Sequence, residues 1–169
     1  MPLTSGISVS AAADLSTALD LATATVPLSL RRAVTLADGT GAGKADKVFH
    51  DRRTLAASAT EDLDLAGVLA DAFGGLITFA RVKAIVVAAA SDNVNNVVIG
   101  AAASTAWATL LNATGTITLR PGAFVAAAAG AADVTAYTVT PSTGDVLKVA
   151  NSGAGSAVTY DIVIIGASA

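Results

Sequence analysis

Residues 146–166 read VLKVANSGAGSAVTYDIVIIG, and this stretch decides the fold class. Before the turn at Asn151–Gly155, apolar Leu147 and Val149 flank Lys148. After the turn, the residues alternate again, with apolar positions at Val158, Tyr160, Ile162 and Ile164 and polar positions at Thr159 and Asp161. A period of two places apolar side chains on one face of a strand and polar ones on the other. The stretch therefore predicts two antiparallel strands, each with one buried and one solvated face.

The same alternation recurs along the chain. It appears at Val34/Leu36, Leu63/Leu65, Val82/Ala84/Val86, Ile117/Leu119 and Tyr137/Val139. Residues that favour turns lie between these segments, at Asp38-Gly39, Arg120-Pro121-Gly122 and Pro141–Asp145. The spacing indicates at least about eight short strands, which favours an all-β antiparallel sandwich or jelly roll.

One short helix is predicted over residues 66–73. Leu65, Leu69, Ala72 and Phe73 would share a helix face. Asp64 can cap the first turn, and Gly74 can end the helix. The fold prediction is thus a β domain with one short helix.

The chain of 169 residues, 53% of them hydrophobic, is long enough for one domain with its own core. Residues 1–14 are small and polar, with Pro2, Ser5, Gly6 and Ser8 among them. We expect these residues to form an extended N-terminal arm, or a frayed terminus, and residues 15–169 to form a single β domain.

Charge and composition exclude several classes of partner. The formal net charge is −3, and no cluster of basic and aromatic residues offers a footprint for phosphate backbones, so direct nucleic-acid binding is not expected. The first residues lack the basic and apolar segments of a secretory signal. Residues 93–119 carry no charge, but repeated Asn, Ser and Thr interrupt them, which is typical of short strands and turns rather than of a membrane span.

No reactive constellation emerges from the sequence, and we predict a protein that is not an enzyme and needs no cofactor or metal. Gly39–Lys44 resembles a phosphate-binding loop but lacks its spacing and the following Ser or Thr. His50 is the only histidine and there is no Cys, so neither a multi-histidine site nor a thiolate site can form. The carboxylates of Glu61, Asp62 and Asp64 fit a solvated strand face better than a calcium loop.

Four residues are candidates for contacts with other protein chains. Leu3, Ile7 and Val9 are the apolar members of the N-terminal arm and can fill shallow pockets on a neighbour. Trp107 lies between expected strands. It is either a core residue beneath a loop or an anchor at a subunit interface, where Trp is enriched.

Several blocks resemble small virion proteins of tailed bacteriophages. They are Asp64–Gly67, Asp71–Gly74, Arg120–Gly122, Thr143–Asn151 and Tyr160–Gly166, and the resemblance covers about residues 30–166. Within that group the chain is most similar to capsid decoration (cement) proteins. The resemblance implies a homotrimer on the capsid exterior, bound to the major capsid protein, and it brings no catalytic residues.

Composition independently favours an assembly role. A domain poor in charge and free of Cys offers mainly surface complementarity, and the charge-poor residues 94–119 predict apolar area that a neighbouring copy covers. The main alternative is a head-fibre or tail module that binds a host-surface glycan or receptor. A third alternative, an enzyme acting on cell-wall carbohydrate, requires a carboxylate pair that the sequence does not indicate.

Overall fold

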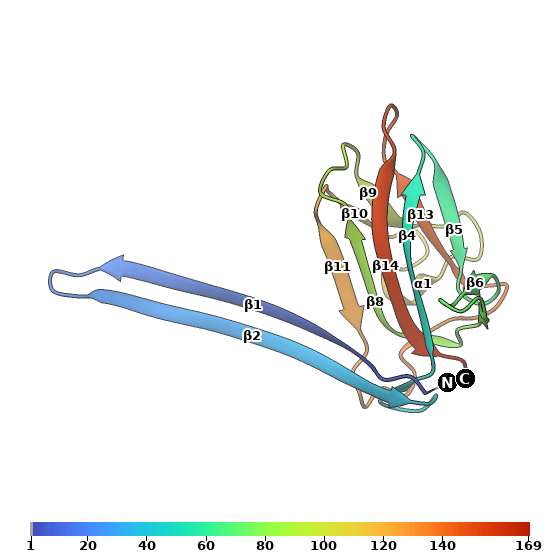
Figure 1. The fold of residues 1–169 in the computed structure, drawn as a ribbon, viewed down its shortest axis with the longest axis horizontal. Helices are drawn as coiled ribbons and strands as arrows, with labels where there is room; N and C mark the ends of the chain where they lie inside the picture. Colours follow the sequence, from blue (N-terminus) through green and yellow to red (C-terminus); the bar gives the residue numbers. More distant parts are fainter. Residues whose placement is uncertain (1) are drawn as a thin grey trace.

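A computed structural model describes residues 2–169 as a β sandwich from which a long two-stranded arm projects (Figure 1). The predicted all-β antiparallel sandwich is confirmed. A jelly-roll connectivity is not established by the strand order. Both chain ends lie at the end of the sandwich from which the arm departs.

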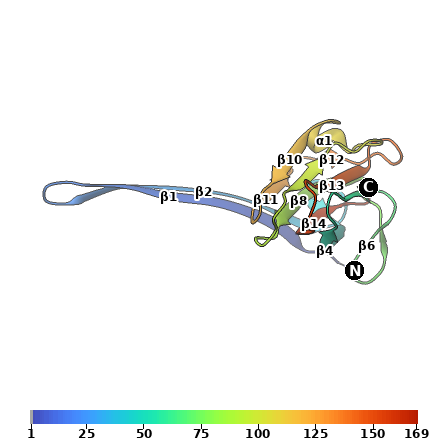
Figure 2. The ribbon, with the colours of Figure 1, turned by 90° about the horizontal axis from the view of Figure 1, so that it is seen from above.

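The arm comprises the first two strands. Strand β1 (Ser5–Ala18) pairs antiparallel with β2 (Thr23–Asp38) along its whole length. The end of β2 then pairs in parallel with the two-residue strand β3 (Lys44–Ala45). Seen from above, the arm is a narrow ribbon that extends well beyond the sandwich (Figure 2).

The larger sheet of the sandwich has five strands. They are β4 (Lys47–Leu55), β8 (Arg81–Ala89), β11 (Phe124–Ala128), β12 (Tyr137–Thr138) and β14 (Val158–Ala167). The order is β11-β8-β14-β4, and β12 also pairs with β8. β11 is therefore an edge strand of this sheet.

The second sheet has four strands in the order β10-β9-β13-β5. Their bounds are Thr60–Asp64 (β5), Val97–Gly100 (β9), Thr116–Leu119 (β10) and Val146–Asn151 (β13). A small hairpin of β6 (Leu69–Ala70) and β7 (Leu76–Ile77) lies beside the sandwich. The stretch quoted first supplies β13 and β14, one strand to each sheet.

The core lies between the two sheets. Most of the apolar positions predicted from alternation face this core, and Leu63, Val149, Tyr160 and Ile162 are buried there. The predicted inward face of residues 82–86 is wrong at Ala84 and Val86, which lie on the outer face of β8, because the neighbouring residues Ile85 and Val87 point into the core instead. Phe79 and Trp107 fill the same core from loops. In β5, β13 and β14 the alternation marks the strand face that meets the opposite sheet, whereas β8 carries apolar residues on both faces.

The helix predicted over residues 66–73 is wrong. These residues form a turn, the short strand β6 and a second turn. Leu65 and Leu69 are both buried, which imitates helical spacing, but the Asp64 Oδ1 atom accepts a hydrogen bond from the Ala66 N–H at 2.9 Å and closes a turn instead. Asp64 therefore caps a turn, as its type favours.

Within residues 2–169 the one helix is α1 (Ala108–Leu111), a single turn after Trp107. No helix in this part of the chain has the length and apolar character needed to cross a bilayer.

Asparagine amides fix the loops at the end of the sandwich opposite the chain ends. Asn93 makes two hydrogen bonds with the Thr159 backbone. Its Nδ2 donates to the Thr159 carbonyl at 2.9 Å, and its Oδ1 accepts from the Thr159 N–H at 2.8 Å. The Asn95 amide donates to the carbonyls of Gly153 and Ser156, and the buried Asn151 amide donates to those of Ala56 and Ser156. These bonds tie the β13–β14 turn to the loops beside it.

Candidate assembly surface

The arm has two chemically different faces. Its register sets Leu15 opposite Val26, Ala13 opposite Leu28 and Ala11 opposite Leu30, and directly opposed residues share a face. The apolar face, by which we mean this side of the arm, comprises Ile7, Val9, Ala11, Ala13, Leu15, Val26, Leu28, Leu30, Val34 and Leu36, with Arg32 as its charged member. The opposite, polar face carries Ser8, Ser10, Asp14, Ser16, Thr25, Ser29, Arg31 and Thr35.

At its base the apolar face packs on the arm's own domain. Leu36 is 1% exposed and lies in a cluster with Ala45, Ala84 and Ile165. Ile7 and Val34 pack against the same cluster. The arm is thus anchored by laying its apolar face on the outer face of the five-stranded sheet.

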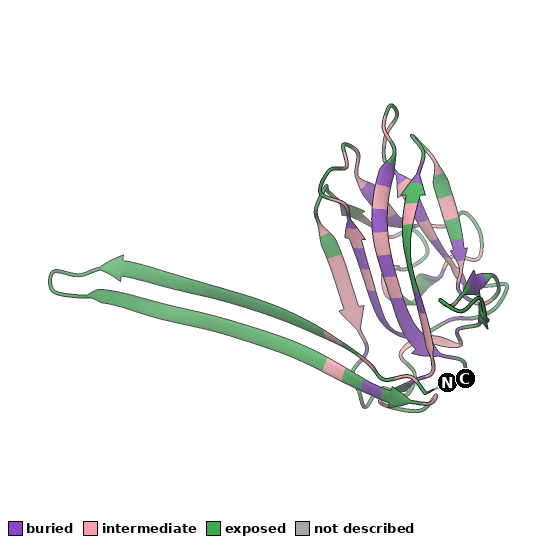
Figure 3. Cartoon of the chain, viewed as in Figure 1, coloured by how far each residue is buried: buried purple, intermediate pink, exposed green. Residues whose placement is uncertain are grey.

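Beyond the base the same apolar face is exposed to solvent (Figure 3). We call residues 9–32 the distal arm. Its exposed fractions are 45% for Val9, 75% for Leu15, 67% for Val26, 62% for Leu28 and 49% for Leu30. Full burial of one such side chain contributes about 1.5–3 kcal/mol, and a lone two-stranded hairpin is at best marginally stable in water. The distal arm therefore has the composition of a docking element.

The outer edge of β2 is blunted by a proline. β2 pairs with β3 only at Ala37 and Asp38, so its remaining outer edge is free. Pro27 lies within that free segment and has no N–H to offer to another strand. Contact through the face of the arm is consequently favoured over addition of a strand at this edge.

The outer face of the five-stranded sheet continues past the arm base. The strand registers place the outward-facing residues of neighbouring strands side by side, in rows that run across the sheet. The row beneath the arm base consists of Ala128, Ala84, Ile165 and Val48. The next positions on the same face are Val86, Ala88, Phe124, Ala126 and Val163, which we call the open sheet face. Phe124 is 67% exposed and the other four are half-buried.

A groove joins the arm to the open sheet face. It has a volume of about 410 Å³ and lies where the arm departs from β11. Its walls are mainly apolar, with Ile7, Val9 and Val34 on the arm side and Ala126 and Ala128 on the β11 side, and Arg32 is the charged residue that lines it. The apolar surface is thus continuous from the distal arm across the corner to the sheet.

Toward β4 the outer sheet face becomes charged. Arg52 and Asp161 form a two-bond pair, with Nε to Oδ1 at 2.6 Å and Nη2 to Oδ2 at 2.9 Å. The hydrogen bond from Arg52 lowers the pKa of the Asp161 carboxyl. The open sheet face is therefore bounded by charge on its β4 side and by a free edge on its β11 side.

Comparison with known proteins returns no match. No protein-family model, no curated protein and no solved structure matches this chain. The functional assignment consequently depends on the chain's own surfaces, of which the arm departs most from a compact sandwich.

The four predicted interface residues occupy three kinds of place. Leu3 and Ile7 pack against their own domain at the arm base, and Val9 lies on the exposed distal arm. Trp107 is 3% exposed in the core, where its Nε1–H donates to the Thr138 carbonyl at 2.9 Å and its ring meets Tyr137 edge-on. Its side chain serves the fold of its own domain.

The structure extends the arm beyond the boundary expected at residue 14. Residues 15–38 belong to the same hairpin, which turns at Asp20 and Leu21 and returns as β2. The residues missed by sequence reasoning are therefore Leu15, Val26, Leu28 and Leu30. Their signal was the alternation in TVPLSL, residues 25–30, next to a turn that has neither Gly nor Pro.

The other predicted positions lie apart from the arm face. Within Gly39–Lys44, residues 39–43 form a turn, and Lys44 already begins β3, so a strand and not a helix follows. His50 is exposed on β4. No group of three or more metal-ligating side chains gathers within the part of the chain that the structure describes.

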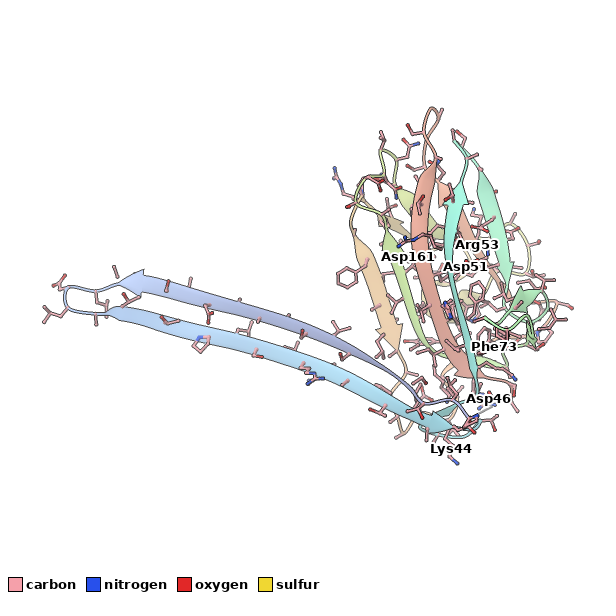
Figure 4. The ribbon with its side chains drawn as sticks, viewed as in Figure 1. Lys44, Asp46, Asp51, Arg53, Phe73 and Asp161 are labelled. Carbon is pink, nitrogen blue, oxygen red and sulfur yellow. The ribbon has the colours of Figure 1, made fainter. Side chains whose placement is uncertain are left out.

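A polar tie closes the sandwich on the β4–β5 side (Figure 4). The buried Tyr160 hydroxyl donates to Glu61 Oε1 at 2.5 Å, and Arg53 Nε donates to Glu61 Oε2 at 2.7 Å. Arg53 also donates to Asp51 at 2.8 Å. Burial, together with the bond to Glu61, raises the pKa of the Tyr160 hydroxyl. Glu61 thus joins the two sheets rather than serving a cation site.

A second groove, of about 660 Å³, lies beside the arm base. Phe73, which is 79% exposed, lines it together with Asp46, His50 and Asp71. Asp71 accepts the N–H groups of Phe73 and Gly75, while Asp46 accepts two bonds from Ser168. The bonds from Gly75 and Phe73 lower the pKa of the Asp71 carboxyl. The groove combines an exposed aromatic ring with carboxylates that backbone bonds hold in place.

Proposed function

We propose that this chain is a structural protein of a tailed-bacteriophage virion, which binds the outside of the assembled capsid and stabilises it. The observation that carries the proposal is the projecting arm, whose exposed apolar face needs a protein surface to cover it. The sequence resemblance to decoration proteins supplies the capsid as the assembly and the major capsid protein as the partner.

Stabilisation follows from mass action. A protein that binds assembled capsomers better than free ones shifts the equilibrium toward the shell. The arm, which the structure holds clear of the sandwich (Figure 2), extends the contact surface of each copy beyond its own domain. Many copies of modest affinity then act together on one particle.

The experiment compares the full-length protein with an arm-shortened variant on purified capsids of the parent phage. Replacing residues 12–29 by Asn-Gly joins the opposed residues Ala11 and Leu30 through a two-residue hairpin turn and keeps the arm base. We expect full-length protein to occupy the capsid exterior in a cryo-electron microscopy reconstruction and to raise the rupture temperature, and the variant to do both less.

The substitution Val94→Asp is the matched control, because Val94 is an exposed apolar residue on a loop far from the arm in sequence. It should leave occupancy unchanged. Full-length protein that leaves capsids bare would refute the decoration role, and undiminished occupancy of the arm-shortened variant would remove the arm from it.

The second candidate is a head-fibre or tail module that binds host-surface glycan, and the groove beside the arm base favours it. Exposed Phe73 offers a ring on which a sugar can stack, and Asp46 and Asp71 offer fixed acceptors for its hydroxyls. Localisation at tail tips, together with loss of glycan binding in Phe73→Ala, would replace the decoration role by this one.

A further inference from the structure

We infer that the distal arm binds a second copy of this chain and lays its apolar face on the open sheet face of that copy. The inference rests on the proposed assembly role of the arm and assigns its apolar face to a neighbouring copy, so that shortening the arm lowers capsid occupancy by removing the link between copies. It concerns a different surface from the charge-poor residues 94–119, whose apolar Val97, Ile99, Trp107 and Leu119 are buried in the core.

The arm base shows what kind of surface the apolar face accepts. There Ile7, Val34 and Leu36 pack against Ala84 and Ile165 on the outside of the five-stranded sheet. Both sides of this contact continue beyond it. The arm continues as Val9, Leu15, Val26, Leu28 and Leu30, and the sheet continues as the open sheet face.

Each copy therefore carries an exposed distal arm and an open sheet face, neither of which is covered within the copy itself. The exposed arm residues are aliphatic, and the open sheet face that would receive them consists of Ala, Val and one Phe, while the sheet side of the contact at the base is formed by Ala and larger aliphatic residues. A second copy offers an open sheet face to the arm of the first copy and an arm to its open sheet face, and both contacts are apolar like the one at the arm base. The groove of about 410 Å³ at the corner makes the two surfaces continuous within one copy.

The arm projects away from its own sandwich on the β11 side (Figures 1 and 2). The ten residues from Val9 to Ala18 extend about 30 Å at the rise of a β-strand. Three neighbouring strands of a sheet span only about 10–15 Å. The distal arm is therefore long enough to cross the β11, β8 and β14 strands of another copy.

The arm and the sheet face are different surfaces, so the contact is head-to-tail. Such contacts form a closed ring when the rotation between copies closes, and otherwise an open chain. A trimeric ring agrees with the number implied by the resemblance to decoration proteins. Pro27 opposes the competing edge-to-edge pairing of arms.

The test measures the oligomeric state in buffer without capsids, by light scattering coupled to size exclusion and by sedimentation across micromolar concentrations. The arm-side variant is Leu15→Asp with Leu28→Asp, both on exposed positions of the apolar face. Its control is Ser16→Asp with Ser29→Asp, which places the same charges on the polar face of the same strands. We expect the arm-side variant to associate at least about 100-fold more weakly, a factor of ten for each substituted residue, and the control to match the wild type.

The sheet-side variant is Phe124→Asp, with Val94→Asp as its control at a similarly exposed position. We expect Phe124→Asp alone to be monomeric. Mixed with the arm-side variant it should form a one-to-one complex, because one chain retains an intact arm and the other an intact sheet face. Near-ultraviolet circular dichroism establishes that each variant keeps its folded core.

Three results would overturn the inference: a monomeric wild type, Phe124→Asp that associates like the wild type, or equal losses in the arm-side variant and its polar-face control. A monomer that nevertheless decorates capsids would overturn only this inference and leave the proposed function standing. A ring of copies that does not bind capsids would support the contact between copies and overturn the proposed function.

Discussion

At the scale of single residues, polar side chains fix the relative position of the two sheets. Tyr160 on β14 is buried, and its hydroxyl meets Glu61 on β5, so one hydrogen bond crosses from sheet to sheet. Arg53 holds the other oxygen of the same carboxylate. Because Glu61 accepts hydrogen bonds from two residues, its orientation is fixed within the fold.

Removing the Tyr160 hydroxyl should destabilise the fold. Tyr160→Phe keeps the ring but deletes a hydrogen bond to a charged acceptor, and such bonds contribute about 1.5–3 kcal/mol. Because Arg53 still pairs with Glu61, we expect a loss of about 1–2 kcal/mol in the free energy of unfolding. Urea denaturation measures it.

Tyr137→Phe is the comparison for that measurement. Tyr137 is half-buried, and its ring packs edge-on against Trp107. Since the substitution keeps this ring contact, its effect should be small. Equal losses in the two variants would contradict the role assigned to the Tyr160–Glu61 bond.

At the scale of elements, Pro27 limits how the arm meets other chains. Pro27→Val restores an N–H on the free edge of β2 and adds a residue that favours strands. We expect faster aggregation by edge pairing, read as thioflavin fluorescence and turbidity against the wild type. Thr25→Val, on the same face of β2, leaves the proline in place and should behave like the wild type. Equal aggregation of the two variants would show that Pro27 does not protect the edge.

Elements with one buried face were predictable from the sequence, and those without one were not. Leu147/Val149 and Tyr160/Ile162 alternate because the opposite sheet covers one side of each strand. In β1 the exposed positions alternate among Ala, Ser, Leu and Thr, whose contrast is weak, and the turn at Asp20–Leu21 lacks Gly and Pro. The hairpin was therefore recognised only in part, as an arm ending at residue 14.

Two further sites show why spacing alone was insufficient. Leu65 and Leu69 have helical spacing, but both reach the core from a turn that the Asp64 carboxylate closes. Trp107 left two interpretations open, because a Trp between strands suits either a core or an interface. Only the positions of Tyr137 and Thr138, which contact it from β12, place it in the core.

At the scale of the whole molecule, the distal arm and the sandwich are separable in stability. The main core begins at Phe49 along the chain and includes no residue of β1 or β2 among those described. The arm-shortened variant should therefore melt within about 4 °C of the wild type, the shift that corresponds to about 1 kcal/mol for a domain of this size. Differential scanning calorimetry measures this midpoint.

Leu36→Ala provides the contrast for that melting experiment. Leu36 is buried where the arm base meets the sheet, and burial of this kind is lost at a cost of about 2–5 kcal/mol. We expect the melting midpoint to fall strongly in Leu36→Ala and only slightly in the arm-shortened variant. A large drop in both would mean that the distal arm supports the sandwich.

The β13–β14 turn has a practical consequence for protein engineering. It lies at the opposite end of the sandwich from the arm base (Figure 1), and Asn95 and Asn151 clamp its flanks. Gly155 sits between those anchors, in the left-handed region at φ 95°, where the space for a side chain is open. A foreign peptide spliced in after Ala154 would be held by rigid stems and would point away from the arm. Under the proposed decoration role, such an insertion would be displayed by every copy bound to the capsid, an arrangement suited to antigen presentation.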